Sequence, residues 1–121
     1  MEYILLIILS YISGSIPYGL LLTKLFGYGD IRNSGSGNIG ATNVLRIVNK
    51  KIAFIVLVLD CAKCYIPTLL SCYFYNDTFG SLCGIFSIIG HIYPFWLKFK
   101  GGKGVACFFG MILAINPLIF I

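Results

Sequence analysis

A polar, glycine-rich stretch at residues 29–46 carries residue types that bind anions. Gly35, Gly37 and Gly40 would let neighbouring backbone N–H groups converge on one anion, an arrangement called a nest. Arg46 adds a fixed charge and a forked set of donors suited to phosphate. Short polar side chains stand between them: Ser36, Asn38, Thr42 and Asn43. We predict that this stretch binds an anion and does more than link two helices.

The same glycines match the Gly-x-Gly-x-x-Gly pattern of dinucleotide-binding proteins, and Asp60 lies 20 residues after Gly40. That fingerprint needs a preceding strand and a βαβ unit. Apolar segments of helical length flank the stretch in this sequence, and Asp60 lies inside one of them. The context therefore excludes a dinucleotide site.

A second glycine-rich stretch, residues 98–105, surrounds Lys103 with Gly101, Gly102 and Gly104. It is not a nucleotide-binding P-loop, because Gly104 supplies no hydroxyl where that motif needs Ser or Thr. An apolar segment begins at Val105, so the stretch precedes a predicted helix, whose free N–H groups and dipole favour phosphate. The alternative is that the lysines only anchor this loop on the cytoplasmic side, which would explain the lysines but not the glycines. We therefore predict a second phosphate site.

Three further ionisable residues lie within apolar segments. His91 is the single histidine, and it is either a hydrogen-bonded structural residue or part of a substrate site. Asp60 and Lys63 are three residues apart, on one face of a predicted helix. An ion pair is the default interpretation because it offsets the cost of burial, and a direct catalytic role is the alternative.

The elements that must position these residues are membrane helices. The chain has 121 residues, of which 59% are hydrophobic and only 11% charged, against about 25% charged in soluble domains. This composition excludes a soluble enzyme, a disordered tail and a secreted disulfide scaffold. We predict an all-α integral membrane protein with one transmembrane domain over residues 1–121. The expected spans are about 3–26 (kinked near Pro17), 52–75, 79–97 and 105–121.

The charges predict the topology. The net charge is +5, and the cations between the spans fall in loops 27–51 and 98–104, not in the turn at residues 76–77. Cytoplasmic loops collect Lys and Arg, so both loops should be cytoplasmic and the N-terminus outside. The basic excess is thus read as topology and not as nucleic-acid binding. The last span is still apolar at Ile121, so we expect a fragment of a longer protein.

The five cysteines all lie in apolar segments: Cys61, Cys64, Cys72, Cys83 and Cys107. We expect them to be packing residues and not disulfides. Cys61-x-x-Cys64 has the spacing of a metal or redox site, but it has no second pair and no polar setting.

Taken together, the motifs resemble the bacterial acyl-phosphate:glycerol-3-phosphate acyltransferases, the PlsY family of phospholipid synthesis. Five stretches match in order: Gly14-Ser15-Ile16-Pro17-Tyr18-Gly19, Gly35 to Asn43 with Arg46, Leu59-Asp60 with Lys63, Gly90-His91 with Pro94, and Lys100 to Ala106. The chain departs from the family at Cys107, where threonine is usual, and at Cys64, where glycine is common. The family's third, C-terminal motif has no counterpart here.

The resemblance implies transfer of a fatty acyl group from acyl phosphate to the sn-1 hydroxyl of glycerol 3-phosphate, giving lysophosphatidic acid and phosphate. By resemblance, Ser36, Arg46 and Lys103 would bind the phosphate of glycerol 3-phosphate. Gly101, Gly102 and Gly104 would shape the acyl-phosphate pocket, while Asn38, Thr42 and Asn43 would order the first loop. No metal or nucleotide cofactor is implied. The alternatives are a transporter component that binds organic phosphates and an inactive remnant of the same fold. Oligomeric state and acyl chain length stay open.

Overall fold

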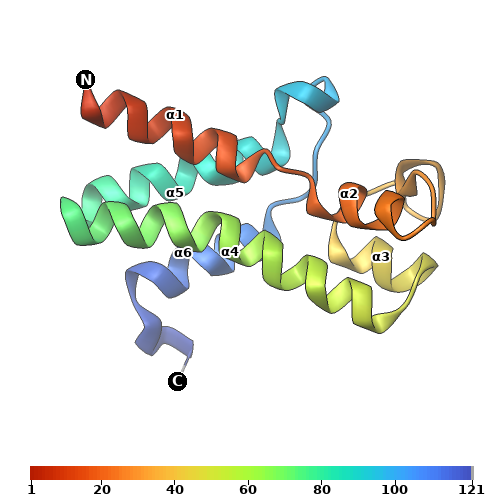
Figure 1. The fold of residues 1–121 in the computed structure, drawn as a ribbon. Helices are drawn as coiled ribbons and strands as arrows, with labels where there is room; N and C mark the ends of the chain where they lie inside the picture. Colours follow the sequence, from red (N-terminus) through yellow and green to blue (C-terminus); the bar gives the residue numbers. More distant parts are fainter. Residues whose placement is uncertain (121) are drawn as a thin grey trace.

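A computed structural model describes residues 1–120, which form helices joined by loops and contain no β-strand. The elements in chain order are α1 (Glu2–Gly14), α2 (Tyr18–Leu25), η1 (Ile31–Asn33), α3 (Ala41–Ile47), α4 (Lys50–Phe74), α5 (Asp77–Ile92), η2 (Phe95–Leu97), α6 (Val105–Ile115) and η3 (Pro117–Phe120). Helices α1, α4 and α5 lie side by side, and α6 packs against α4 (Figure 1). Helices α2 and α3 flank the first half of α4. The all-α prediction is confirmed.

Helices α4 and α5 provide the membrane-spanning segments that stand out by length and composition. Within residues 1–120, Lys50–Phe74 and Asp77–Leu97 are each long and apolar enough to cross a membrane. Helices α1 and α2 together qualify as a third span, bent by 42°. The last predicted span contains α6, whose 11 residues are fewer than the ~20 that cross a hydrocarbon layer. Residue 121 of that span lies outside the described residues.

The bend between α1 and α2 falls at Pro17, which has no N–H to continue the helix. The interruption exposes the carbonyl groups of Ser15 and Ile16, and side chains from other helices bind them. Trp96 Nε1 donates to the Ser15 oxygen at 2.7 Å, and Lys63 Nζ donates to the Ile16 oxygen at 2.8 Å. An unsatisfied carbonyl in the hydrocarbon region costs several kcal/mol, so these two bonds stabilise the break.

A second backbone interruption, at Pro67 inside α4, is compensated in a similar way. Pro67 cannot donate to the carbonyl of Lys63, four residues earlier. Ser13 Oγ of α1 donates to that oxygen instead, at 2.8 Å. One hydroxyl group therefore ties α1 to α4 at the point where α4 lacks a bond of its own.

Lys63 also pairs with Asp60, as the helical spacing predicts. Lys63 Nζ lies 3.0 Å from Asp60 Oδ1, and the two side chains are only 2% and 4% exposed. Two charges buried this deeply must neutralise one another, because an isolated charge in an apolar surrounding is very costly. The predicted ion pair is confirmed.

Close helix contacts depend on glycine. A Cβ atom on Gly14 of α1 would collide with the carbonyl oxygen of Ser87 in α5, and one on Gly110 of α6 would collide with that of Cys61 in α4. Small residues let membrane helices approach backbone to backbone. These contacts bring α6, and with it the loop that precedes it, directly against the middle of α4.

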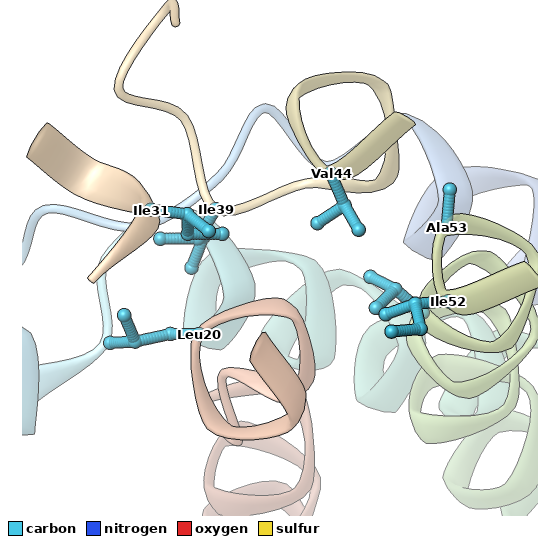
Figure 2. Packing of buried hydrophobic residues seen from close by; sticks show 7 residues of the cluster. Leu20, Ile31, Ile39, Val44, Ile52 and Ala53 are labelled. Carbon is cyan, nitrogen blue, oxygen red and sulfur yellow. The ribbon is translucent and has the colours of Figure 1, made fainter. Parts of the chain in front are cut away.

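A compact apolar cluster lies where α2, the first loop and α3 meet the beginning of α4 (Figure 2). Its members are Leu20, Ile31, Ile39, Val44, Ile52, Ala53 and Val56. Ile31, Val44 and Val56 are fully buried, and each contributes about 1.5–3 kcal/mol by leaving water. The cluster holds both ends of the glycine-rich loop, residues 29–40, on the helices.

Candidate functional site

The first loop is organised around the side chain of Asn43, which is only 1% exposed. Its Nδ2 donates to the carbonyl oxygens of Ile31, Ser34 and Asn38, at 3.2, 3.1 and 2.9 Å. Its Oδ1 accepts a hydrogen bond from the backbone N–H of Ser36 at 3.0 Å. A single amide thus binds four points of the loop, and it does so from the first turn of α3.

Two glycines allow the loop to close around this amide. Gly35 and Gly37 have φ angles of +57° and +77°, a region that L side chains avoid. A Cβ atom on Gly35 would also collide with Asn43 Oδ1. These two positions therefore require glycine because of the turn, and neither residue lines the cavity described below.

The nest predicted from the glycine spacing is not formed by these amides. The N–H of Ser36 bonds to Asn43, and that of Gly37 bonds to the Ser34 oxygen at 2.9 Å. Further along, the N–H of Asn38 reaches Ser36 Oγ at 3.3 Å, and that of Gly40 reaches Asn38 Oδ1 at 2.8 Å. All four donors are used inside the loop, so none of these four is free to bind an anion.

Arg32, another cation of the first loop, forms an ion pair with Asp30. Its Nη2 lies 2.6 Å from Asp30 Oδ2, and its Nε donates to Oδ1 of the same carboxylate at 2.9 Å. Lys24 lies 4.0 Å from this carboxylate. The hydrogen bonds from Arg32 lower the pKa of Asp30 to about 2. Arg32 is thus held at the rim of the loop and is not available as an anion ligand.

The second loop is fastened to the end of α5. The N–H of Gly101 donates to the Ile92 oxygen at 2.9 Å, and that of Gly102 to the His91 oxygen at 3.0 Å. A Cβ atom on Gly102 would collide with the imidazole of His91. Gly101 and Gly102 therefore bring the backbone onto α5 and do not themselves face the cavity. Gly104, with φ +84°, turns the chain into α6.

The two loops share one cavity of about 390 Å³, within the ~300–1,000 Å³ usual for ligand sites. Its walls come from the first loop, α3, the middle of α4, the end of α5, the second loop and the first turns of α6. The lining residues are Ser36, Asn38, Gly40, Ala41, Thr42, Asn43, Arg46, Leu57, Asp60, His91, Lys103, Gly104, Val105, Ala106 and Phe109.

Most residues predicted to form the site surround this cavity. The structure brings nine of them together: Ser36, Asn38, Gly40, Thr42, Asn43, Arg46, His91, Lys103 and Gly104. Four others support the loops from behind: Gly35, Gly37, Gly101 and Gly102. Sequence reasoning left Leu57 and Phe109 out, because nothing in a long apolar run distinguishes a cavity wall from a lipid-facing position.

The electrostatics of the cavity favour an anion. Arg46 of α3 and Lys103 of the second loop both line it, and both are solvent-exposed. Neither forms an ion pair with another residue of the part of the chain that the structure describes. Asp60 also lines the cavity, but its charge is balanced by Lys63 at 3.0 Å. The free charge facing the cavity is therefore positive.

Within residues 1–120, the cysteines form no disulfide bond and the potential metal ligands form no cluster. All five cysteines are free, and Cys107 Sγ donates to the backbone oxygen of Asp60 at 3.3 Å. Cys107 thus links α6 to α4. Residues 1–120 hold no group of three or more His, Cys, Asp or Glu side chains that could bind a metal ion.

The fold and the cavity define a multi-pass helical membrane protein with two glycine-rich loops around a cationic pocket. A sequence model of the family described as Glycerol-3-phosphate acyltransferase matches residues 4–121. The chain therefore belongs to the glycerol-3-phosphate acyltransferase family, which confirms the resemblance carried by the five matched stretches.

Curated relatives from several bacteria support this assignment, and each is called glycerol-3-phosphate acyltransferase. The Rhizobium etli protein is 46% identical over 114 residues, covering 94% of this chain and 55% of that relative. The Ehrlichia canis protein is 52% identical over 115 residues, or 94% of this chain and 60% of the relative. The Macrococcus caseolyticus protein is 45% identical over 121 residues, covering 100% of this chain and 62% of that relative. The chain thus spans little more than half the length of these relatives.

Two crystal structures of PlsY (YgiH), an integral membrane glycerol 3-phosphate acyltransferase, have the same fold. The glycerol 3-phosphate form superposes with a TM-score of 0.93 at 40% identity, covering 98% of this chain and 60% of that one. The lysophosphatidic acid form gives a TM-score of 0.90 at 38% identity, covering 98% of this chain and 59% of that one. This likeness confirms the prediction of an integral membrane protein.

Proposed function

We propose that the protein transfers a fatty acyl group from acyl phosphate to the sn-1 hydroxyl of glycerol 3-phosphate, producing lysophosphatidic acid and inorganic phosphate. The observation that carries the proposal is the cavity that Arg46 of α3 and Lys103 of the second loop both line. Both proposed substrates carry a phosphate group, and two unpaired cations in one pocket suit them. The names of the relatives agree with this chemistry.

In this proposal the phosphate of glycerol 3-phosphate binds Arg46, Lys103 and the hydroxyl of Ser36. Arg46 contributes a planar, forked donor set and Lys103 a compact charge, so together they fix the orientation of a phosphate group. The first loop is ordered before substrate arrives, since the Asn43 amide already contacts four of its backbone groups. A prearranged site of this kind needs little rearrangement to stabilise charge in the transition state.

The acyl phosphate would place its headgroup near Gly104 and the first turn of α6, with its chain passing between helices. Leu57 and Phe109 give the cavity an apolar wall on the lipid side. Acyl phosphate is a mixed anhydride and is already activated, so the reaction needs positioning and charge stabilisation more than a protein nucleophile.

The chemical step balances without a further reactant. The sn-1 hydroxyl oxygen attacks the acyl carbonyl carbon and forms the ester bond, and the bond between that carbon and the phosphate oxygen breaks. The hydroxyl proton passes to an oxygen of the departing phosphate. Arg46 and Lys103 would stabilise the negative charge that accumulates on the phosphate groups.

The proposed setting is the bacterial cell membrane, or the inner membrane where the envelope has two. The two cationic loops would face the cytoplasm and the N-terminus the outside. Labelling of Arg46→Cys and Lys103→Cys with a membrane-impermeant maleimide tests this: both should react only when the cytoplasmic face is open. Reaction of the two positions from opposite faces would contradict a shared site.

The activity test uses the full chain purified into lipid nanodiscs. Phosphate release from palmitoyl phosphate should depend on added glycerol 3-phosphate and should yield lysophosphatidic acid. Lys103→Ala should lower kcat/KM by about 10- to 100-fold, the loss expected for one charge-assisted contact. Lys100→Ala is the matched control, because this lysine lies in the same loop but does not line the cavity.

Two other results would contradict the proposal. Binding of glycerol 3-phosphate without phosphate release would identify an inactive remnant of the fold. Uptake of glycerol 3-phosphate into proteoliposomes, without any ester product, would identify a transport component.

A further inference from the structure

An aromatic surface lies outside the cavity, on the segment that joins α5 to the second loop. Four of its side chains are between 48% and 59% exposed: Tyr93, Phe95, Trp96 and Phe99. Lys98 stands between the last two of them in the sequence and is exposed as well. These five residues make up the aromatic surface. In Figure 1 the segment that carries them, drawn in light blue after α5, stands out from the bundle beside the bend between α1 and α2.

The aromatic surface is fixed to the end of α1. Trp96 Nε1 donates to the Ser15 oxygen at 2.7 Å, and the hydroxyl of Tyr11 donates to the Tyr93 oxygen at 2.6 Å. The rings of Tyr11 and Phe95 are stacked, with centroids 6.4 Å apart. The exposed rings therefore belong to a segment with defined contacts and not to a loose loop.

Two consecutive residues of this surface have a left-handed backbone. The φ angles of Lys98 and Phe99 are +55° and +63°, a region that residues other than glycine adopt only with strain. The N–H of Phe99 closes the turn by donating to the Pro94 oxygen at 2.9 Å. Glycine would fit both positions with less strain, so an exposed ring and an exposed cation at these positions indicate that the side chains themselves are used.

The charge of Lys98 has no carboxylate near it among residues 1–120. Two of the four acidic residues of the chain are in the ion pairs described above. The other two, Glu2 and Asp77, begin α1 and α5, whereas the aromatic surface lies at the opposite ends of these helices. At 1.5 Å per residue this separation is about 20 Å or more. A negative charge beside Lys98 must therefore come from outside these residues.

The position of the surface indicates a lipid partner. The apolar segment long enough to cross a membrane, Asp77–Leu97, ends one residue before Lys98. Tyr and Trp are enriched where hydrocarbon meets the lipid headgroups, and lysine side chains near the ends of spans extend into the same layer. An acidic protein would match the charge, but it would not account for four exposed rings at the end of a span.

We propose that the aromatic surface is an anchor in the headgroup layer of the membrane, with the rings among the headgroups and Lys98 bound to an anionic phospholipid. This segment continues directly into the second loop, so the anchor would hold Lys103 at the membrane surface. None of the five residues of the surface lines the cavity. The proposal therefore does not depend on the reaction proposed for the cavity, and each can fail without the other.

The fluorescence of Trp96 provides the test, because it is the single tryptophan of the chain. The full chain is reconstituted into vesicles of phosphatidylcholine with a minority of phosphatidylglycerol. In one set of vesicles the phosphatidylglycerol carries bromine atoms on its acyl chains, and these atoms quench tryptophan on contact. In the other set an equal amount of phosphatidylcholine carries them. The two sets have the same charge, so the difference in quenching measures the preference of the surface for the anionic lipid.

Wild type should prefer phosphatidylglycerol by at least about fivefold, the factor expected for one lysine at an anionic membrane surface. Lys98→Gln should lower this preference by about threefold or more, because the charge is lost. Quenching by brominated phosphatidylcholine should not fall in this variant, since the ring stays in the membrane. Lys98→Gly also relieves the left-handed strain, so it provides a second variant and should lose as much preference. Lys100 is present in every variant and contributes equally to each measurement.

Lys51→Gln is the matched control, because it removes an exposed lysine at the start of α4 and should keep the wild-type preference. Equal quenching of wild type by the two lipids would overturn the proposal. A Lys98→Gln protein with the wild-type preference, or an equal loss in Lys51→Gln, would overturn it too, by showing that the preference does not come from this lysine. Absence of quenching by either lipid would overturn it by showing that Trp96 faces water or another protein chain.

Discussion

Asn43 offers the sharpest test of how the first loop is built. Asn43→Ala removes the contacts of the amide nitrogen with three carbonyl oxygens, which share its two hydrogens, and the bond accepted from the Ser36 N–H. A buried hydrogen bond contributes about 0.5–1.5 kcal/mol net, so three such bonds give a loss of about 1.5–4.5 kcal/mol of local stability. At 1.4 kcal/mol per tenfold, a loss of about 3 kcal/mol corresponds to a roughly 100-fold larger equilibrium constant for opening of the loop.

Hydrogen exchange, measured by mass spectrometry on the chain in nanodiscs, reports this change in the opening of the loop. Peptides covering residues 31–40 should lose protection by roughly 100-fold in Asn43→Ala, while peptides within α5 should not change. Asn33→Ala is the matched control: this amide lies in the same loop, is exposed and makes no side-chain hydrogen bond within residues 1–120. Asn43→Asp keeps the acceptor but directs a carboxylate oxygen at the three carbonyl oxygens, so it should lose at least as much protection as Asn43→Ala.

The reasoning would be refuted if Asn43→Ala exchanged like wild type over residues 31–40. The apolar cluster around Ile31 and Val44 would then be sufficient to hold the loop, and the amide would have no share in ordering it. A uniform loss of protection in every helix would refute it differently, by showing a global role for Asn43.

Two further predictions concern helix contacts. Ser13→Ala should cost about 1–3 kcal/mol of stability, because it leaves the Lys63 oxygen without a donor. In a Pro67→Ala background the cost should shrink, since alanine restores the N–H that reaches that oxygen, and equal costs in both backgrounds would contradict this account. Gly102→Ala should lower the Tm, because the new methyl group meets the imidazole of His91. His91→Ala should rescue that Tm, and a Gly102→Ala protein as stable as wild type would show that the loop can move away.

Helices and their approximate bounds could be predicted from the sequence. Apolar runs interrupted by few charges predict spans at 52–75 and 79–97, and the structure has α4 at Lys50–Phe74 and α5 at Asp77–Ile92. The bend of the first segment lies at Pro17, as the missing N–H predicts. The short α6 was not predictable to the same degree, because hydropathy does not show where a helix ends at Asn116.

The backbone hydrogen bonding of the first loop could not be predicted from the sequence. Glycine spacing indicated a backbone nest, whereas the backbone donors of residues 36, 37, 38 and 40 are used inside the loop. Which donors stay free depends on where the side chain of Asn43 lies, and that position is set by the packing of α3 on α4.

The sequence by itself determined the membrane class, the family and the cationic residues of the two loops. These properties depend on residue types and local spacing, because apolar runs predict spans and matched stretches predict membership of a family. Only the tertiary structure decided that Asp60 and His91 stand in the same cavity wall as Arg46 and Lys103. The physical reason is helix packing, because Gly110 lets α6 lie directly on α4 and Gly102 lets the second loop lie on His91, and such contacts between distant segments leave no local pattern along the chain.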